Sequence, residues 1–274
     1  MIKHLFCGIV LVSLCLFLGC SDNCADNPSV GGIPLSAGYD GESRTIRRGN
    51  IDIEIVFVAA GTFTQGAGGC IAEGLCPTER QVTLTRGFWI GKYEVTQAQY
   101  QAVMGNNPSY FSGNPNNPVE QVTWHNATEF ASKVGGRLPT EAEWEFAARG
   151  GNRSQGFIYS GSNDLNEVGW FGENWGNENF SSIPEVGKKK SNELGIYDMS
   201  GNVVEWVNDW VENFSSTPVT DPTGPSTGTY RPYRVARGGS VFHDALGNRL
   251  VLRSVYYPDG WSSNLGFRVV FPVN

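Results

Sequence analysis

The stretch RVARGGSVFHDALGNRLVLRSVYYPDGWSSNLGFRVV, Arg234 to Val270, decides how the rest of the chain is interpreted. It opens with the turn signal RGGS, in which Gly238 and Gly239 allow backbone angles that other residues avoid. It closes with LGFRVV, whose aromatic and β-branched residues favour a strand. The residues between, Val241 to Leu265, show neither helical nor strand periodicity. The pattern predicts a long irregular segment that is specified at both ends.

This segment, which we call the window (Val241–Leu265), is rich in side chains that make contacts. Tyr and Trp offer large contact areas at low entropy cost, while Ser, Asn and Asp adapt their hydrogen bonds to a partner. The sequence therefore predicts a ligand-binding surface displayed by a scaffold, although for Trp261 burial in the core is an equally good interpretation. The candidate binding residues are Phe242, His243, Asp244, Leu246, Asn248, Tyr256, Tyr257, Asp259, Trp261, Ser262 and Ser263.

Composition limits the class of protein and of partner. The chain has 274 residues, enough for one large domain with a buried core once a leader is removed. Its 35 Gly and 8 Trp predict many turns held together by large apolar side chains. The net charge of −7 makes nucleic acid an unsuitable partner.

The N-terminus has the features of an export signal. Lys3 and His4 precede an apolar run that is too short for a comfortable membrane span and that ends at Gly19-Cys20. FLGC resembles a bacterial lipobox, with Phe17 where Leu is usual, as in spirochaetes. We therefore expect residues 1–19 to be a lipoprotein signal peptide and Cys20 to carry lipid; an ordinary secretory signal is the alternative.

The segment that follows, residues 20–50, is polar and is predicted to be a flexible tether. The expected location is the bacterial outer membrane or cell surface, where the lipid on Cys20 would hold the chain to the membrane. The folded domain is then expected over residues 51–274, beginning with a half-buried strand at Ile51.

Cap chemistry predicts three helices in this domain. They start at Thr96, Asn126 and Thr140 and end near Gly105, Gly135 and Gly150. In the third helix, the spacing of Trp144, Ala147 and Ala148 predicts that Trp144 anchors the core.

The same helix carries Glu141, Glu145 and Arg149 in one row at i, i+4 and i+8. Paired carboxylates for acid–base chemistry are one interpretation of this row. A solvent-facing ladder of ion pairs is the interpretation that the spacing favours.

The cysteines and carboxylates suggest two further sites. Cys70 and Cys76 flank a short Gly-containing loop, so a local disulfide is expected in an exported protein. A zinc site lacks histidine ligands to join these cysteines, because the chain after Cys20 contains only two histidines, His125 and His243. Around a Gly-Asn turn, carboxylates and carbonyls provide hard oxygen ligands that suit Ca²⁺.

Several motifs, in order, resemble those of one family. They are FVAAGTFTQG, FWIGKYEVTQAQYQAVMG, NPVEQVTWHNATEF, GGRLPTEAEWEFAARGG, NELGIYDMSGNVVEW, RVARGGS and LGFRVV. Together they resemble the formylglycine-generating enzyme (sulfatase-modifying factor) domain. The resemblance covers Ile51 to Asn274 and implies a loop-rich α+β fold of the C-type-lectin-like kind. It also implies calcium ligands at Asp198, Gly201, Val203 and Glu205.

The family's oxidase chemistry depends on two copper-binding cysteines after the RGGS-like turn. By alignment they fall on His243 and Asn248, and no cysteine occurs from Val241 onward. An imidazole and an amide cannot replace two thiolates for Cu(I), so we expect no formylglycine-generating activity and no required cofactor, with calcium as the one candidate ion. An inactive or divergent homologue with another enzymatic or structural role is the alternative. For a hydrolase, His243 would be the only plausible base besides His125, and no Ser/His/Asp spacing is visible.

The window also resembles the hypermutated cassette of proteins diversified by retroelements, including the Treponema-type variable lipoproteins. In that class, asparagine codons mutated at adenine cannot yield Lys, Glu, Gln or Met, and the window contains none of these. Trp cannot arise this way either, so Trp261 would be a fixed codon. The resemblance implies a non-catalytic protein that binds an unknown protein or other surface ligand.

Overall fold

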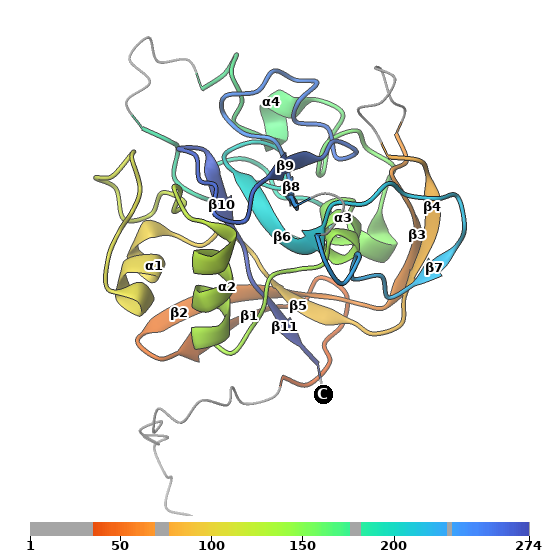
Figure 1. Cartoon of the computed structure of the whole chain (residues 1–274), viewed down its shortest axis with the longest axis horizontal. Helices are drawn as coiled ribbons and strands as arrows, with labels where there is room; N and C mark the ends of the chain where they lie inside the picture. The colour runs from red at the N-terminus through yellow and green to blue at the C-terminus, as the bar shows by residue number, and fades with distance from the viewer. Residues whose placement is uncertain (1–34, 69–76, 176–181, 229–231, 274) are drawn as a thin grey trace, which may run out of the picture.

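The computed structural model describes residues 35–68, 77–175, 182–228 and 232–273. Short strands and helices are joined by long irregular connections, and the expected loop-rich α+β architecture is confirmed (Figure 1). No helix in these described ranges is both long enough and apolar enough to cross a membrane. Cys20, the signal peptide and the Cys70–Cys76 pair lie outside the described residues.

The first sheet shows that the domain begins earlier than its expected start at Ile51. Its strand order is β1-β2-β5-β11, formed by Ser43–Arg48, Ile51–Val58, Phe88–Gly91 and Val270–Pro272. β1 pairs with β2 along its whole length, and Leu35 bridges to Val273. The predicted tether over residues 20–50 is therefore wrong for its last part. The arginines of SRTIRR hide the strand, because Ile46 is its single buried apolar side chain.

The second sheet holds both ends of the window. Its strand order is β10-β6-β8-β9, formed by Leu265–Phe267, Val204–Trp210, Arg234–Arg237 and Ser254–Tyr256. β8 precedes the window and β10 ends it, so two neighbours of β6 fix its entry and exit. The expectation that the window lacks strands is wrong at β9, which pairs with β8.

A third sheet, β3-β4-β7, is formed by Gly61–Gln65, Arg80–Leu84 and Val219–Thr220. The helices are α1 (Gln97–Met104), α2 (Trp124–Lys133), α3 (Glu141–Ala148) and the short α4 (Leu165–Val168), with a 3-10 turn at Gly151–Arg153.

Reciprocal capping at Thr96 and Thr140 starts α1 and α3 where the sequence predicted. The start of α2 differs from the prediction by three residues. Its cap is Thr123, and Asn126 is the third helical residue, which completes the capping box. Both residues have cap-forming side chains, so the sequence pattern alone assigned the wrong one as the cap.

The core lies between the first sheet and the three longer helices. One apolar cluster joins β2 and α2 to β6 and β10, and a second joins β5 and α3 to β8. Trp144 is fully buried, as predicted, and its indole nitrogen donates to Glu205 at 2.9 Å. Burying Trp144 and Trp206 removes large apolar surfaces from water, which offsets the cost of ordering so many irregular connections.

Candidate functional site

Exposed apolar side chains are concentrated in the window. Of the seven large hydrophobic residues that are exposed in the described chain, five belong to this segment; Tyr39 and Tyr110 are the others. Trp261 is 62% exposed, so its alternative placement in the core is ruled out. This concentration of exposed apolar side chains in one stretch of sequence marks it as a candidate interaction segment. The five window residues are Phe242, Leu246, Val255, Tyr257 and Trp261.

Aromatic residues outside the window support one end of it. The rings of Phe242 and Trp175 pack edge to face with centroids 5.0 Å apart, and Phe111 lies 6.2 Å from both rings. The exposed ring of Tyr110 packs edge to face on Phe111 at 4.9 Å. Phe242 therefore projects from an aromatic base built by the scaffold, which limits its rotamers and lowers the entropy cost of binding.

The other end of the window carries a hydrogen-bonding rim. Tyr257 packs against Tyr233 with centroids 4.4 Å apart, and their hydroxyl oxygens are 3.0 Å apart. Asp259 is strongly exposed, and its carboxylate lies 3.5 Å from Nε2 of His125. This part of the surface combines aromatic area with groups that can pair with a polar partner.

Three backbone hydrogen bonds tie the window to two distant segments. The amide of Gln121 donates to Ser262, the amide of Trp124 donates to Pro258, and the amide of Gly172 donates to His243. These bonds are 2.9–3.0 Å long and use main-chain atoms on both sides. The exposed side chains of the window can therefore change without removing these main-chain contacts.

A hydrogen-bonded chain runs beneath the surface to His243. Ser262 Oγ donates to Asn264 Oδ1 at 2.6 Å, and Asn264 Nδ2 donates to Ser240 Oγ at 2.8 Å. Ser240 Oγ also accepts from the amide of Phe242 and lies 2.9 Å from Nδ1 of His243. The hydroxyl proton of Ser240 is therefore directed to Nδ1, which leaves the imidazole proton on Nε2.

This arrangement makes His243 a neutral hydrogen-bonding group. Burial lowers the pKa of His243, against a smaller opposing effect of Asp244. Ser240, the hydroxyl beside the ring, is fully buried and cannot reach a bound substrate as a nucleophile. The geometry therefore gives the ring a hydrogen-bond donor at Nε2 and does not form an accessible nucleophile–base pair of Ser240 and His243.

Two candidate binding residues are structural. Asn248 is fully buried and donates to the carbonyl oxygens of His243 at 3.3 Å and Asp244 at 2.7 Å. Its predicted place on the binding surface is wrong, because these bonds draw the amide inward to close the loop. Tyr256 is half-buried and packs edge to face on Trp206 at 5.6 Å.

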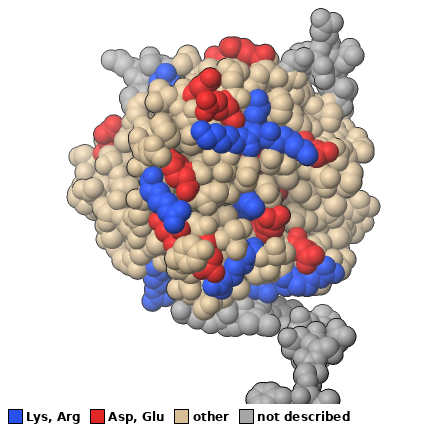
Figure 2. Space-filling model, turned by 180° about the vertical axis from the view of Figure 1, so that it is seen from behind, with Lys and Arg blue, Asp and Glu red and all other residues tan. Residues whose placement is uncertain are grey.

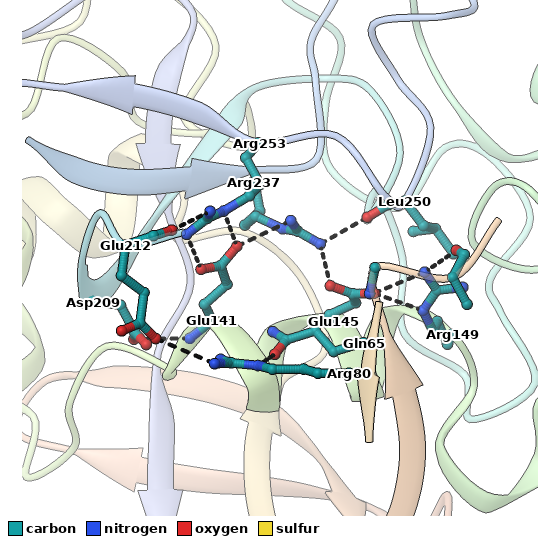
Figure 3. Close-up of polar contacts among 12 residues, drawn as sticks. Gln65, Arg80, Glu141, Glu145, Arg149, Asp209, Glu212, Arg237, Leu250 and Arg253 are labelled. Atoms are coloured by element: carbon teal, nitrogen blue, oxygen red, sulfur yellow. Dashed lines mark hydrogen bonds and ion pairs between the residues drawn. The ribbon is translucent and has the colours of Figure 1, made fainter. Parts of the chain in front are cut away.

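The sequence analysis predicted that the acidic row of α3 faces solvent, and this prediction is wrong. Glu141 and Glu145 are buried, and their contacts are drawn in Figure 3. Arg237 from β8 donates to Glu141 at 3.1 Å, to Glu145 at 2.7 Å and to the carbonyl of Leu250 at 2.7 Å. Arg253 from the window donates twice to Glu141, at 2.6 and 2.7 Å.

The helical row was identified correctly, but its partners come from distant segments that spacing within a helix cannot reveal. The one signal in the sequence was a charged residue, Arg237, directly after the apolar pair Val235-Ala236 and before the GGS turn. These two arginines, which the sequence analysis missed, fasten the window to α3.

Asp198 and Glu205, the two carboxylates implied as calcium ligands, interact electrostatically, yet their surroundings do not fit the ion. Both carboxylate oxygens of Glu205 accept from Arg268 at 2.6 Å, and all four charged groups of this cluster are buried. A guanidinium in that position repels a divalent cation and occupies the oxygens that would bind it. Asp198 retains one oxygen without a partner in the described chain, and burial raises its pKa to about 6. The four charged groups of this cluster are thus Glu205, Arg268, Asp198 and Glu94.

Charges of both signs alternate over the face that Figure 2 shows, with no large area of one sign. This face carries no continuous basic stripe of the kind that is typical of nucleic-acid-binding surfaces.

A loop-rich α+β domain that displays a long C-terminal segment between an RGGS turn and a GFR strand defines the formylglycine-generating-enzyme type of fold. Residues 47–273 match the family described as "Sulfatase-modifying factor enzyme 1-like domain", and the chain belongs to that family. The resemblance deduced from the sequence motifs is thus confirmed.

Three similar proteins show which kinds of protein carry this domain. The solved structure titled "Treponema denticola variable protein 1" superposes with a TM-score of 0.74 at 30% identity, covering 84% of this chain and 99% of that one. "Chaperone protein LppX" of Paenibacillus barcinonensis is 32% identical over 86% of this chain and 96% of its own length. "Formylglycine-generating enzyme" of Streptomyces coelicolor is 41% identical over 58% of this chain and 54% of the enzyme, so the match spans about half the enzyme's length.

Proposed function

We propose that this chain is a non-catalytic binding protein that recognises a ligand with the window, Val241–Leu265, on a scaffold of the formylglycine-generating-enzyme type. The observation that carries the proposal is the concentration of exposed apolar side chains in this one segment. Interfaces place their binding energy in a few aromatic anchors surrounded by polar groups. Phe242, Tyr257 and Trp261 would be the anchors, with Asp244, Asp259 and Ser263 on the rim.

The way the window is fastened supports variation of its side chains. Its path is fixed by main-chain hydrogen bonds and by the buried pair of Arg253 and Glu141, whereas its anchors project outward. Exchanging an exposed anchor would change the preferred ligand without unfolding the domain. We therefore propose that the window is a diversified cassette. A nearby genomic near-repeat of the window, rich in AAC codons and beside a reverse-transcriptase gene, would support diversification; its absence would contradict it.

A lipid on Cys20 would place this surface outside the cell or at the outer membrane, as the apolar leader and FLGC indicate. The ligand is then a protein or other molecule met at that surface. Metabolic labelling with a palmitate analogue tests this step. Label should enter the wild-type chain and be lost in Cys20→Ser; label retained by Cys20→Ser would contradict anchoring at this residue.

Binding is tested by panning a phage-displayed peptide library on the purified domain. Enriched peptides are measured by biolayer interferometry against the wild type, against Phe242→Ser/Tyr257→Ser/Trp261→Ser, and against Tyr39→Ser. Tyr39 is an exposed aromatic residue outside the window and serves as the matched control. We expect binding to the wild type and to Tyr39→Ser but not to the triple variant. Peptides that bind the triple variant equally well would contradict the proposal.

The second candidate function is a divergent enzyme of the same family, which the 41% identity to a formylglycine-generating enzyme favours. His243 and Asn248 stand where that chemistry needs two thiolates. The two candidates are separated by incubating the protein and Cu(I) with a sulfatase-type cysteine peptide. Formylglycine above the no-enzyme control would establish the enzyme, and its absence is expected for the binding protein.

A further inference from the structure

A cavity of about 450 Å³ lies apart from the binding surface. It opens between the β4–β5 turn, the start of α3, the segment after β7 and the end of β11, and no window residue lines it. In Figure 1, β5 and β11 lie below β8 and β9, and β4 and β7 lie to their right. The volume is within the range of pockets that hold small organic molecules.

Most charged groups at this cavity are already paired. Arg137 donates to both oxygens of Glu143 at 2.6 Å, which neutralises that carboxylate and fixes the wall formed by α3. Asp221 accepts from the amide of Thr85 at 2.8 Å and from its hydroxyl at 2.5 Å. These groups shape the cavity, but their hydrogen-bonding capacity is largely spent: Arg137 and Glu143 bind each other, and Asp221 binds Thr85.

Three polar groups that line the cavity are unpaired in the described chain. They are the guanidinium of Arg86, the side-chain amide of Asn208 and the hydroxyl of Thr223. Asn208 is held in place by its backbone, whose amide donates to Pro139 and whose carbonyl accepts from Arg234. The cavity therefore offers a guanidinium that has no carboxylate partner, together with an amide and a hydroxyl.

The remaining wall is apolar. Phe88, Pro222 and Pro272 line the cavity, and Phe88 is almost completely buried within the first sheet. Two of these three residues are prolines, whose rings present rigid apolar surface without adding a backbone donor. A ligand that matches the cavity would place an apolar body here and a charged end at Arg86.

We propose that this cavity binds a small organic monocarboxylate with an apolar body. The guanidinium of Arg86 matches a carboxylate by two parallel hydrogen bonds, and Asn208 can donate a third. A dianion such as phosphate is disfavoured, because its second charge would face the carboxylate of Asp221, which hydrogen-bonds only to the neutral groups of Thr85. The site is independent of the window and of the function proposed for it.

The probes are N-acetyl-leucine and N-acetyl-phenylalanine, with their uncharged amides as matched controls. Each is titrated into the ¹⁵N-labelled protein to about 10 mM, and backbone amide shifts are followed by NMR. We expect saturable shifts near the cavity for at least one of the acids and at least about tenfold weaker binding for its amide. Arg86→Gln and Asn208→Asp should each weaken binding of the acid by about tenfold or more. Arg47→Gln, an arginine on β1 far from the cavity, should leave it unchanged.

Arg86 is exposed and unpaired, so Arg86→Gln is expected to fold with an unchanged thermal midpoint. Asn208→Asp tests the same charge requirement at the proposed third donor. Equal affinities for acid and amide, unchanged affinity in Arg86→Gln, or no saturable shift with either acid would each overturn the proposal.

Discussion

Arg253, in the middle of the window, holds the carboxylate of Glu141 in the first turn of α3 by two hydrogen bonds of 2.6 and 2.7 Å. Both side chains are largely buried, and the same guanidinium donates to the carbonyl of Glu212 at 2.8 Å. This pair divides the window into two exposed loops, one around Asp244 and one around Tyr257. Each loop is then short and is fastened at both ends, which allows its exposed side chains to differ without changing the fold.

Breaking this pair should destabilise the whole domain. Arg253→Gln removes one cation from a buried carboxylate, so we expect the free energy of unfolding to fall by about 3 kcal/mol. Urea denaturation followed by tryptophan fluorescence measures the change. The control is Arg47→Gln, whose ion pair with Asp52 is exposed, and whose effect should stay within about 0.5 kcal/mol. Similar effects of the two substitutions would mean that the buried pair does not fasten the window.

Two tryptophans should separate surface from scaffold. Trp261→Ala removes a side chain that is 62% exposed and should change stability by no more than about 0.5 kcal/mol. Trp206→Ala removes a fully buried indole that also donates to the carbonyl of Val122 at 2.9 Å, and should cost about 3–5 kcal/mol. Urea midpoints of both variants give the comparison. A large loss for Trp261→Ala would place that ring in the structural core after all.

Much of the fold could be predicted from the sequence, because its signals are local. Thr96 with Gln99 and Thr140 with Glu143 satisfy the first amides of their helices, and such chemistry is visible in a short segment. β1 escaped prediction because Arg44, Arg47 and Arg48 outnumber its apolar residues, and its strand character depends on pairing with β2. Pairing across chain segments leaves no local pattern for a strand of this composition.

The candidate site was predictable as a segment but not residue by residue. The lack of periodicity and the many aromatic residues identified the window. Burial of Asn248 could not be deduced, because its hydrogen bonds depend on how the loop closes. The role of Arg237 was equally hidden, since its carboxylate partners Glu141 and Glu145 are more than ninety positions away.

Stability should fall as the pH rises from about 4 to 8. Burial, with Glu141 and then Glu143 as neighbours, raises the pKa of Asp209 to about 8, whereas an unfolded aspartate titrates near 4. In this range the folded state keeps a proton that the unfolded state releases, so each pH unit removes up to about 1.4 kcal/mol. Glu120, whose pKa burial raises to about 7, adds to the fall.

Asp209→Asn isolates the contribution of this carboxylate. The amide oxygen can still accept from the backbone of Glu141, which Asp209 does at 2.9 Å, but the side chain no longer titrates. We expect a shallower fall in stability between pH 5 and 8, measured by urea denaturation at each pH. Identical slopes for wild type and variant would show that Asp209 is not protonated in the folded state.

Calcium should leave the thermal midpoint unchanged. A bound ion would raise the midpoint by mass action, but the oxygens of Glu205 are held by Arg268 at 2.6 Å. Melting curves are compared in millimolar CaCl₂ and in EGTA, with magnesium as the control for ionic strength. A rise of the midpoint in calcium alone would show that the ion displaces Arg268 and that the family's ligand set, Asp198 to Glu205, is functional here.

The last prediction concerns Asn248, the window residue that cannot be exchanged freely. Its amide hydrogens bind the carbonyls of His243 and Asp244, and Asn248→Asp would replace two donors with a buried carboxylate facing carbonyl oxygens. We expect a loss of about 2–4 kcal/mol and faster amide hydrogen exchange from Val241 to Leu250. Asp244→Asn is the matched control, because this exposed side chain keeps an oxygen for the amide of Gly247 and should cost no more than about 0.5 kcal/mol. In a library that randomises the window and is selected for folding, position 248 should retain asparagine while positions 242, 244 and 246 vary. If position 248 varied as freely as these neighbours, Asn248 would not be the residue that closes the first exposed loop.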